Sequence, residues 1–130
     1  IRQEVLNASP EKLVCVVFRY LILYYEKSLF DFDNNSKLYL SDLRKCQKLM
    51  VELINALDTS ELEVMKHLSK LYHLIYKKTV DAYLLKKPEN IQEILPLVKE
   101  LKKMWDEVYT NCEINVFDVR EDRVLLNIVA

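Results

Sequence analysis

His67 and His73 are the two side chains of this chain best suited to metal binding or proton transfer. A di-iron helical bundle requires the motif Glu-x-x-His on two helices, but the residues three positions before these histidines are Val64 and Lys70. A helical ribonuclease would require an Arg a few residues before a His, and neither His has one. The two histidines are six residues apart, which places them on different faces of a helix. We therefore expect ordinary surface or partly buried histidines, and neither a ligand pair nor a catalytic base.

The three cysteines, Cys15, Cys46 and Cys112, are an odd set with wide spacings. Two of them lie among apolar residues with helical spacing, which is typical of buried, reduced thiols in a cytosolic protein. We therefore expect no disulfide. No His lies near Cys15 to activate its thiol, so this residue is expected to fill space as a small apolar side chain.

Glycine is absent from the 130 residues. Phosphate-binding loops and dinucleotide-binding turns need Gly where the backbone approaches the ligand or takes positive φ, so these classes are excluded, and no cofactor is expected. Hairpin-rich all-β folds are disfavoured for the same reason. The 19 basic and 20 acidic side chains nearly cancel, so no net field favours a nucleic acid or an anionic membrane.

The least polar stretch runs from Leu13 to Tyr25, with Arg19 as its one charged residue. Its thirteen residues are fewer than the roughly 20 that a bilayer-spanning helix requires. The first residues also lack the pattern of a secretory signal. We therefore expect no membrane insertion and a cytoplasmic location.

Four segments repeat apolar residues every three or four positions, the spacing of amphipathic helices. Their starts carry helix-start signals: Pro10 after a Ser, Ser36, the capping-box pair Ser60 and Glu63, and Pro88. The predicted helices span residues 10–29, 36–58, 60–86 and 88–110.

The first predicted helix carries two apolar seams where a surface helix needs one. The surplus predicts a second neighbouring element or a bound partner. The members of the seams are Leu13, Val17, Tyr20 and Tyr24 in one, and Phe18, Ile22, Tyr25 and Leu29 in the other. Residues 30–35 are predicted to form the following turn, and Pro96 is expected to kink the last helix or to divide it in two.

Short connections between these helices predict an all-α fold, an antiparallel up-down four-helix bundle over residues 1–112. Residues 113–130 lose the helical period but remain rich in apolar, β-branched residues. This C-terminal segment is expected to form a short hairpin or to dock as a tail. It would cover a binding groove, pair with a second copy to give a homodimer, or pack on its own domain.

Three stretches, VLNASPEKLV, ELINALD and LSKLYHLIYKKTVDAYLLKKPENIQEILPLVKELKKMW, resemble the FliS family of flagellin export chaperones. The resemblance covers roughly residues 4–108 in the same order. It implies a helical bundle that binds the disordered C-terminal segment of flagellin in the cytosol, prevents premature assembly, and meets the export apparatus, without being an enzyme. A diverged adaptor bundle and a self-assembling protein with a non-flagellin partner are the alternatives.

An apolar groove between helices is the feature that such a function needs. The expected client-binding residues are Leu49, Leu53, Leu68, Tyr72, Ile75, Tyr76 and Leu101. Five tyrosines are open to two interpretations, core packing with the hydroxyl at the edge or use in an interface. They are Tyr20, Tyr24, Tyr72, Tyr76 and Tyr83. The lysine pairs 77–78, 86–87 and 102–103 are interpreted as solvated faces, because acids lie among them.

Overall fold

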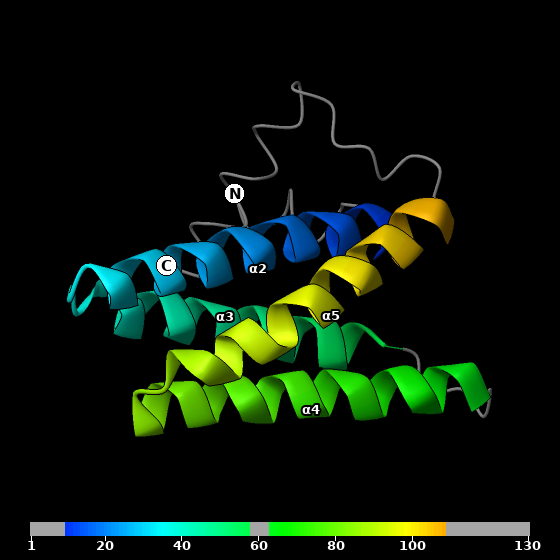
Figure 1. Ribbon diagram of the computed structural model, residues 1–130. Coiled ribbons are helices and arrows are strands. Elements are labelled where there is room, and N and C mark those ends of the chain that lie inside the picture. Colours follow the sequence, from blue (N-terminus) through cyan, green and yellow to red (C-terminus); the bar gives the residue numbers. More distant parts are fainter. Residues whose placement is uncertain (1–9, 58–62, 109–130) are drawn as a thin grey trace.

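The computed structural model describes residues 10–57 and 63–108, and side chains from residue 14 onward. It has four helices, α2 (Pro10–Asp33), α3 (Leu38–Ala56), α4 (Glu63–Leu85) and α5 (Pro88–Val108). Successive helices run in opposite directions, and α5 crosses the front of the bundle from the end of α4 toward the start of α2 (Figure 1). Helix is the sole regular structure of the described ranges, which confirms the predicted all-α four-helix bundle.

The helices pack in a ring in which α2 contacts α3, α3 contacts α4, α4 contacts α5, and α5 returns to α2. Short links between antiparallel neighbours produce this order in up-down bundles. The predicted capping box at Ser60 and the segment 113–130 lie outside the described residues.

Both apolar seams of α2 are used inside the bundle. Val17 and Tyr24 of the first seam and Phe18 and Tyr25 of the second are buried. Ile22 and Leu29 of the second seam are half-buried against the core. Because α2 contacts both α3 and α5, its surplus apolar surface serves two neighbouring helices, and no client is needed to explain it.

The end of α2 differs from the prediction, because the helix continues past residue 29 to Asp33. Asp31 lies one turn beyond Lys27 and accepts a hydrogen bond from its Nζ at 3.0 Å. Asp31 is also buried. This i,i+4 pair within α2 and the burial of Asp31 favour helical geometry where the Asp and Asn content favours a turn, so the prediction of a turn at residues 30–33 is wrong.

The turn itself occupies the shorter stretch from Asn34 to Lys37. The side chain of Asn34 donates to the carbonyl of Phe30 at 2.8 Å, and Asn35 takes a positive φ of 55°, a conformation that Asn tolerates better than most residues. Ser36 Oγ accepts from the backbone N–H of Leu38 at 3.2 Å. Ser36 therefore satisfies a free amide at the start of α3, but the N-cap position is Lys37 and the helix starts at Leu38, two residues later than predicted.

The link between α4 and α5 has Lys86 at a positive φ of 56°. A helix commonly ends on a residue in this conformation, and Gly is the usual choice, but this chain has none. α5 then runs through Pro96 without a break, so the alternative of two separate helices at this proline is wrong.

Candidate functional site

The structure places the predicted client-binding residues mainly in the core. All but one are buried; Tyr76 is half-buried. The buried members come from three helices and meet in the interior: Leu49 and Leu53 from α3, Leu68, Tyr72 and Ile75 from α4, and Leu101 from α5. The predicted residues therefore lie close together, but as the inner wall of the bundle, with Tyr76 at its outer edge.

Tyr72 is the clearest case of a predicted contact residue that holds the bundle together. It is 1% exposed, and its ring lies 6.1 Å from that of Phe18 in a tilted arrangement. Its hydroxyl accepts a hydrogen bond from Trp105 Nε1 at 2.9 Å. Tyr72 therefore links α4 to both α2 and α5, and a charge placed here would act on folding before it acted on binding.

A second buried polar pair crosses the bundle from α2 to α4. Thr79 donates its hydroxyl proton to the carbonyl of Ile75 at 2.7 Å. Its oxygen lies 2.6 Å from the Tyr25 hydroxyl, and because the Thr proton is already used, Tyr25 is the donor of this bond. Burial raises the pKa of Tyr25 well above its ordinary value, so this hydroxyl stays protonated and able to donate.

The surface between α3 and α4 is one of the places where apolar side chains remain partly open to solvent. Arg44 of α3 reaches Tyr83 of α4, with Nη2 3.2 Å from its hydroxyl and the guanidinium 5.8 Å from the ring centre. Residues three, four and seven positions from these two share their helix faces. We call this surface the α3–α4 seam; it comprises Leu40, Arg44, Gln47, Val51 and Ile54 of α3, and Tyr76, Val80 and Tyr83 of α4.

Most members of the α3–α4 seam are half-buried, and Val51 is 39% exposed. The Nε2 of Gln47 is buried without a hydrogen-bond partner, an arrangement that costs free energy in a folded protein. A long row of half-covered apolar groups between two helices is a setting in which another polypeptide can bury its own apolar face.

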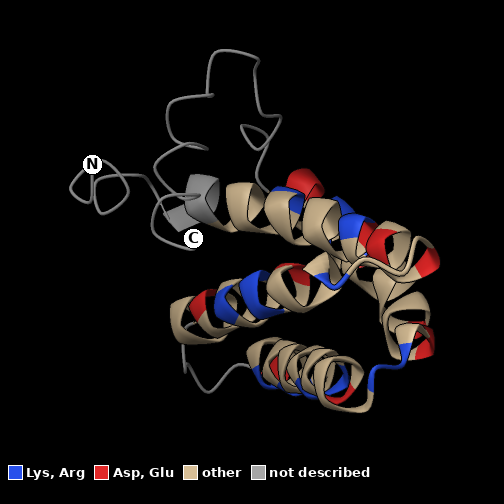
Figure 2. Cartoon of the chain, turned by 90° about the vertical axis from the view of Figure 1, so that its left-hand side faces the viewer, with Lys and Arg blue, Asp and Glu red and all other residues tan. Residues whose placement is uncertain are grey.

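Basic side chains border this seam on both helices. On α4 they lie at spacings of four, three and four, which makes a single row: Lys66, Lys70, His73 and Lys77. Arg44 and Lys48 lie on the α3 side. In Figure 2 blue segments occupy the middle of α3 and recur along α4, the helix below it.

Three ion pairs lie away from this seam. Lys99 of α5 lies 3.1 Å from Glu26 of α2, Lys102 lies 2.6 Å from Asp106, and Lys78 of α4 lies 3.2 Å from Glu93 of α5. Of the acids that lie among the lysine pairs in the sequence, Asp106 forms one of these ion pairs. Lys78 and Lys102 are half-buried, so the interpretation of these lysine pairs as solvated faces holds only for their exposed members.

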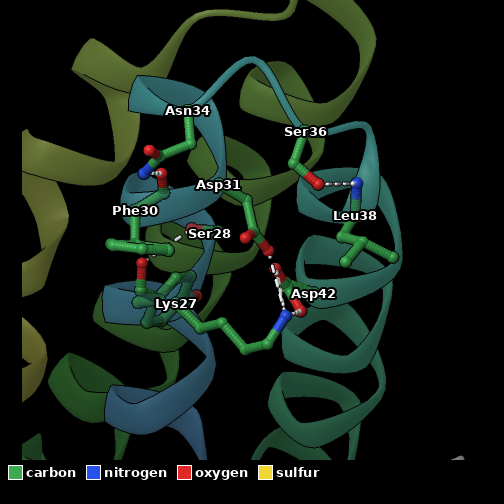
Figure 3. Close-up of polar contacts among 9 residues, drawn as sticks. Lys27, Ser28, Phe30, Asp31, Asn34, Ser36, Leu38 and Asp42 are labelled. Carbon is green, nitrogen blue, oxygen red and sulfur yellow. Dashed lines mark hydrogen bonds and ion pairs between the residues drawn. The ribbon is translucent and has the colours of Figure 1, made fainter.

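A buried carboxyl pair joins α2 to α3, on the side of α3 that faces α2 (Figure 3). Lys27 Nζ lies 3.0 Å from Asp31 Oδ2 and 3.0 Å from Asp42 Oδ1. Burial, together with the hydrogen bond to Asp31, raises the pKa of Asp42 from 3.8 to about 6. The hydrogen bonds from Asp42 and Lys27 lower the pKa of Asp31. The pair therefore shares one proton in mildly acidic solution, with Asp31 as the charged member.

His67 and His73 are exposed on α4, as the sequence predicted. His73 Nδ1 lies 2.7 Å from the carbonyl of Ser69. Among the described residues, no three His, Cys, Asp or Glu side chains gather as metal ligands would.

The cysteines correct one expectation. Cys46 is buried with a free thiol, and burial raises its pKa, as expected for a space-filling residue. Cys15, in contrast, is disulfide-bonded, so the expectation of no disulfide is wrong. An odd number of cysteines rules out complete pairing but does not rule out a single bridge.

The tyrosines divide between the two interpretations. Tyr20, Tyr24 and Tyr72 are buried, whereas Tyr76 and Tyr83 are half-buried in the α3–α4 seam. Lys45 lies over the Tyr24 ring at 5.1 Å. The sequence analysis did not select Arg44, Val51 and Val80, which are members of the α3–α4 seam. Their spacing of three, four or seven residues from other seam members on the same helix is the pattern that would have identified them.

The described residues thus form a helical bundle with a filled core and a half-open apolar seam. No helix of the described ranges is long and apolar enough to cross a membrane. The family model described as flagellar protein FliS matches residues 1–112, and the chain belongs to this family. It is therefore a flagellar export chaperone and not an enzyme, and the family implies flagellin as its partner. Comparison with curated proteins gives no match.

Proposed function

We propose that this chaperone binds the C-terminal segment of flagellin in the cytoplasm, keeps it from assembling, and releases it at the export apparatus. Family membership supports the flagellar role. The observation that carries the binding site is the α3–α4 seam, in which apolar groups of two helices stay half-covered along several turns.

The predicted groove residues have two roles in this proposal. Tyr76 contacts the client directly, because it lies at the open edge of the seam. The buried members, exemplified by Leu53 and Ile75, form the wall behind it and fix the distance between α3 and α4. Removing the wall would change the seam indirectly, through packing.

Two exposed apolar residues give a matched test. Val51, 39% exposed, lies in the α3–α4 seam, and Leu74, 45% exposed, lies on α4 outside it. Val51→Asp is expected to weaken binding of a flagellin C-terminal peptide at least tenfold by isothermal titration calorimetry, because it places a charge where the apolar client face packs. Leu74→Asp is expected to change the affinity by less than about twofold.

Circular dichroism and thermal unfolding of both variants control for folding. Equal loss of affinity in the two variants, with the fold intact, would contradict the seam as the binding site. Failure of the unaltered protein to bind any flagellin peptide would contradict the proposed client and favour the diverged-adaptor alternative.

The remaining parts of the proposal concern organisation. Residues 1–112 act as the binding unit and residues 113–130 as a separate tail. A homodimer through that tail is one arrangement; solution mass of the chain with and without residues 113–130 tests it. An unchanged monomer mass would exclude the dimer.

A further inference from the structure

We propose that Cys15 forms its disulfide bond with Cys112, and that this bond holds residues 113–130 against the outer face of α2. The outer face is the stripe of α2 that carries Val16, Leu23 and Phe30, which follow one another at steps of seven residues. The inference does not depend on the identity of the client. It assigns a covalent link between the end of the bundle and its first helix, and a binding surface for the C-terminal segment.

The cysteine count identifies the partner of Cys15. The chain has three cysteines. Cys15 is disulfide-bonded, whereas Cys46 keeps a free thiol. Cys112 is therefore the cysteine that remains for a bond within one chain.

The position of Cys15 on α2 agrees with this pairing. Cys15 lies eleven residues before Glu26, which is three helical turns and places both on one side of the helix. That side faces α5, because Glu26 lies 3.1 Å from Lys99 of α5. α5 runs toward the start of α2 (Figure 1) and ends at Val108. Cys112 follows four residues later, a stretch that spans at most roughly 14 Å, so Cys15 is within its reach.

The burial of α2 shows that its first turns are covered on nearly every side. The four residues from Cys15 to Phe18 are each at most 2% exposed, and four successive positions span about 300° of a helix surface. The main helical neighbours of α2 are α3 and α5, and each packed helix covers an arc of about 100°. A further segment of the chain is therefore needed to cover this part of α2.

The outer face locates this cover. Val16 is buried, whereas Leu23 and Phe30 of the same stripe are 52% and 65% exposed. The cover therefore ends between Val16 and Leu23. A segment that is bonded to Cys15 starts beside Val16, and residues 113–130 are rich in apolar side chains, which gain free energy when they leave water. These residues therefore fit the covered end of the stripe.

The bond forms by thiol–disulfide exchange with a low-molecular-weight disulfide such as oxidised glutathione. One protein thiolate attacks the small disulfide, which gives a mixed disulfide and releases one small thiol. The second protein thiolate attacks the protein sulfur of the mixed disulfide, and the second small thiol leaves. The protein loses two electrons and two protons, and the two small thiols carry them. A dithiol reverses the exchange, so we expect the link to be closed under oxidising and open under reducing conditions.

Peptide mapping tests the bond in the full chain, treated either with oxidised glutathione or with dithiothreitol. After alkylation in denaturant, trypsin releases the three cysteines in separate peptides, residues 13–19, 46–48 and 104–120. Mass spectrometry of the oxidised, monomeric chain is expected to find peptides 13–19 and 104–120 joined, and peptide 46–48 alkylated. A bond that includes peptide 46–48, or three alkylated peptides after oxidation, would overturn the proposal.

Limited proteolysis of the native full chain tests the position of the C-terminal segment. Trypsin cleaves after Arg120 and Arg123, and it cleaves a released segment faster than a docked one. Reduction is expected to speed these two cleavages at least tenfold and to change cleavage after Lys37, in the turn between α2 and α3, by less than twofold. Cys112→Ser should be cleaved without reductant as fast as the reduced chain. Equal cleavage of the oxidised and reduced chains would overturn the docking, in favour of another segment as the cover of Val16.

Val16→Asp and Leu23→Asp are the matched variants, because both lie on the outer face and only Val16 is covered. In the oxidised chain, Val16→Asp is expected to speed cleavage after Arg120 at least fivefold, since it places a charge beneath an apolar segment. Leu23→Asp is expected to change it by less than twofold. Circular dichroism controls for the fold. Equal effects of the two variants would overturn the docking site, and so would unfolding of Val16→Asp alone, which would show that the helices themselves cover Val16.

Discussion

Replacing Asp42 by Asn is expected to stabilise this protein at neutral and alkaline pH. Asp42 is 2% exposed and faces both Lys27 and Asp31. The Asn amide reproduces the neutral carboxyl: its oxygen accepts from Lys27, and its NH₂ donates to Asp31. The substitution therefore removes the ionisation of Asp42 while keeping the contacts of its protonated form.

The size of the effect follows from the pKa of Asp42, which is raised from 3.8 to about 6. Between these values the folded state binds more protons than the unfolded state, so stability falls as pH rises toward 6. At about 1.36 kcal/mol per pKa unit, the ionised Asp42 costs about 3 kcal/mol above pH 7. The lowered pKa of Asp31 has the opposite sign, and its contribution is lost in acid.

Urea unfolding followed by Trp105 fluorescence measures this difference, because Trp105 is the single tryptophan and lies in the core. The free energy of unfolding of Asp42→Asn should exceed that of the unaltered protein by about 1 kcal/mol near pH 4.5 and by about 3 kcal/mol near pH 8. Glu52→Gln removes an exposed carboxylate from the same helix and controls for net charge. A difference that does not depend on pH, or an Asn variant less stable at pH 8, would refute the reasoning.

Three further predictions concern stability and use the same urea assay. Lys86→Gly should stabilise the protein by about 0.5 to 1 kcal/mol, because Gly adopts the positive φ of this position without steric cost. Lys87→Gly is the neighbouring control and should not stabilise the protein. Thr79→Val should cost about 1 to 3 kcal/mol by leaving the Tyr25 hydroxyl without its acceptor, whereas Thr79→Ser, which keeps that oxygen, should cost less. Tyr72→Phe should lower the free energy of unfolding by about 1 kcal/mol, because it removes the acceptor of the hydrogen bond from Trp105. Tyr72→Asp should abolish cooperative unfolding. A folded Asp variant would show that position 72 is not part of the core.

The helices could be predicted from the sequence because their apolar spacing and start signals agree with the packing. The start of the first helix at Pro10 and of the last at Pro88 match the structure. The end of α2 could not be predicted, because the local pair of Asp31 with Lys27 is reinforced by the position of Asp31 beside Asp42 of another helix. Local composition carries no information about such a distant partner.

The proposed binding surface was harder to predict than the fold. Apolar periodicity identifies a face that must be covered but does not say whether a neighbouring helix or a client covers it. Tyr72 and Ile75 have the same spacing as contact residues would have, and the structure buries both. The α3–α4 seam is defined instead by the contact between Arg44 and Tyr83, which lie 39 residues apart, so that only the packed bundle reveals it.

Site-specific photo-crosslinking tests the central claim, that the α3–α4 seam holds the client, most directly. A photoreactive phenylalanine analogue at position 51, inside the seam, is compared with the same analogue at position 74, which is similarly exposed on α4 but outside the seam. With a flagellin C-terminal peptide present, we expect a crosslinked product from position 51 and little or none from position 74. A product from position 74 alone, or equal products from both, would contradict the assignment of the client site to the seam.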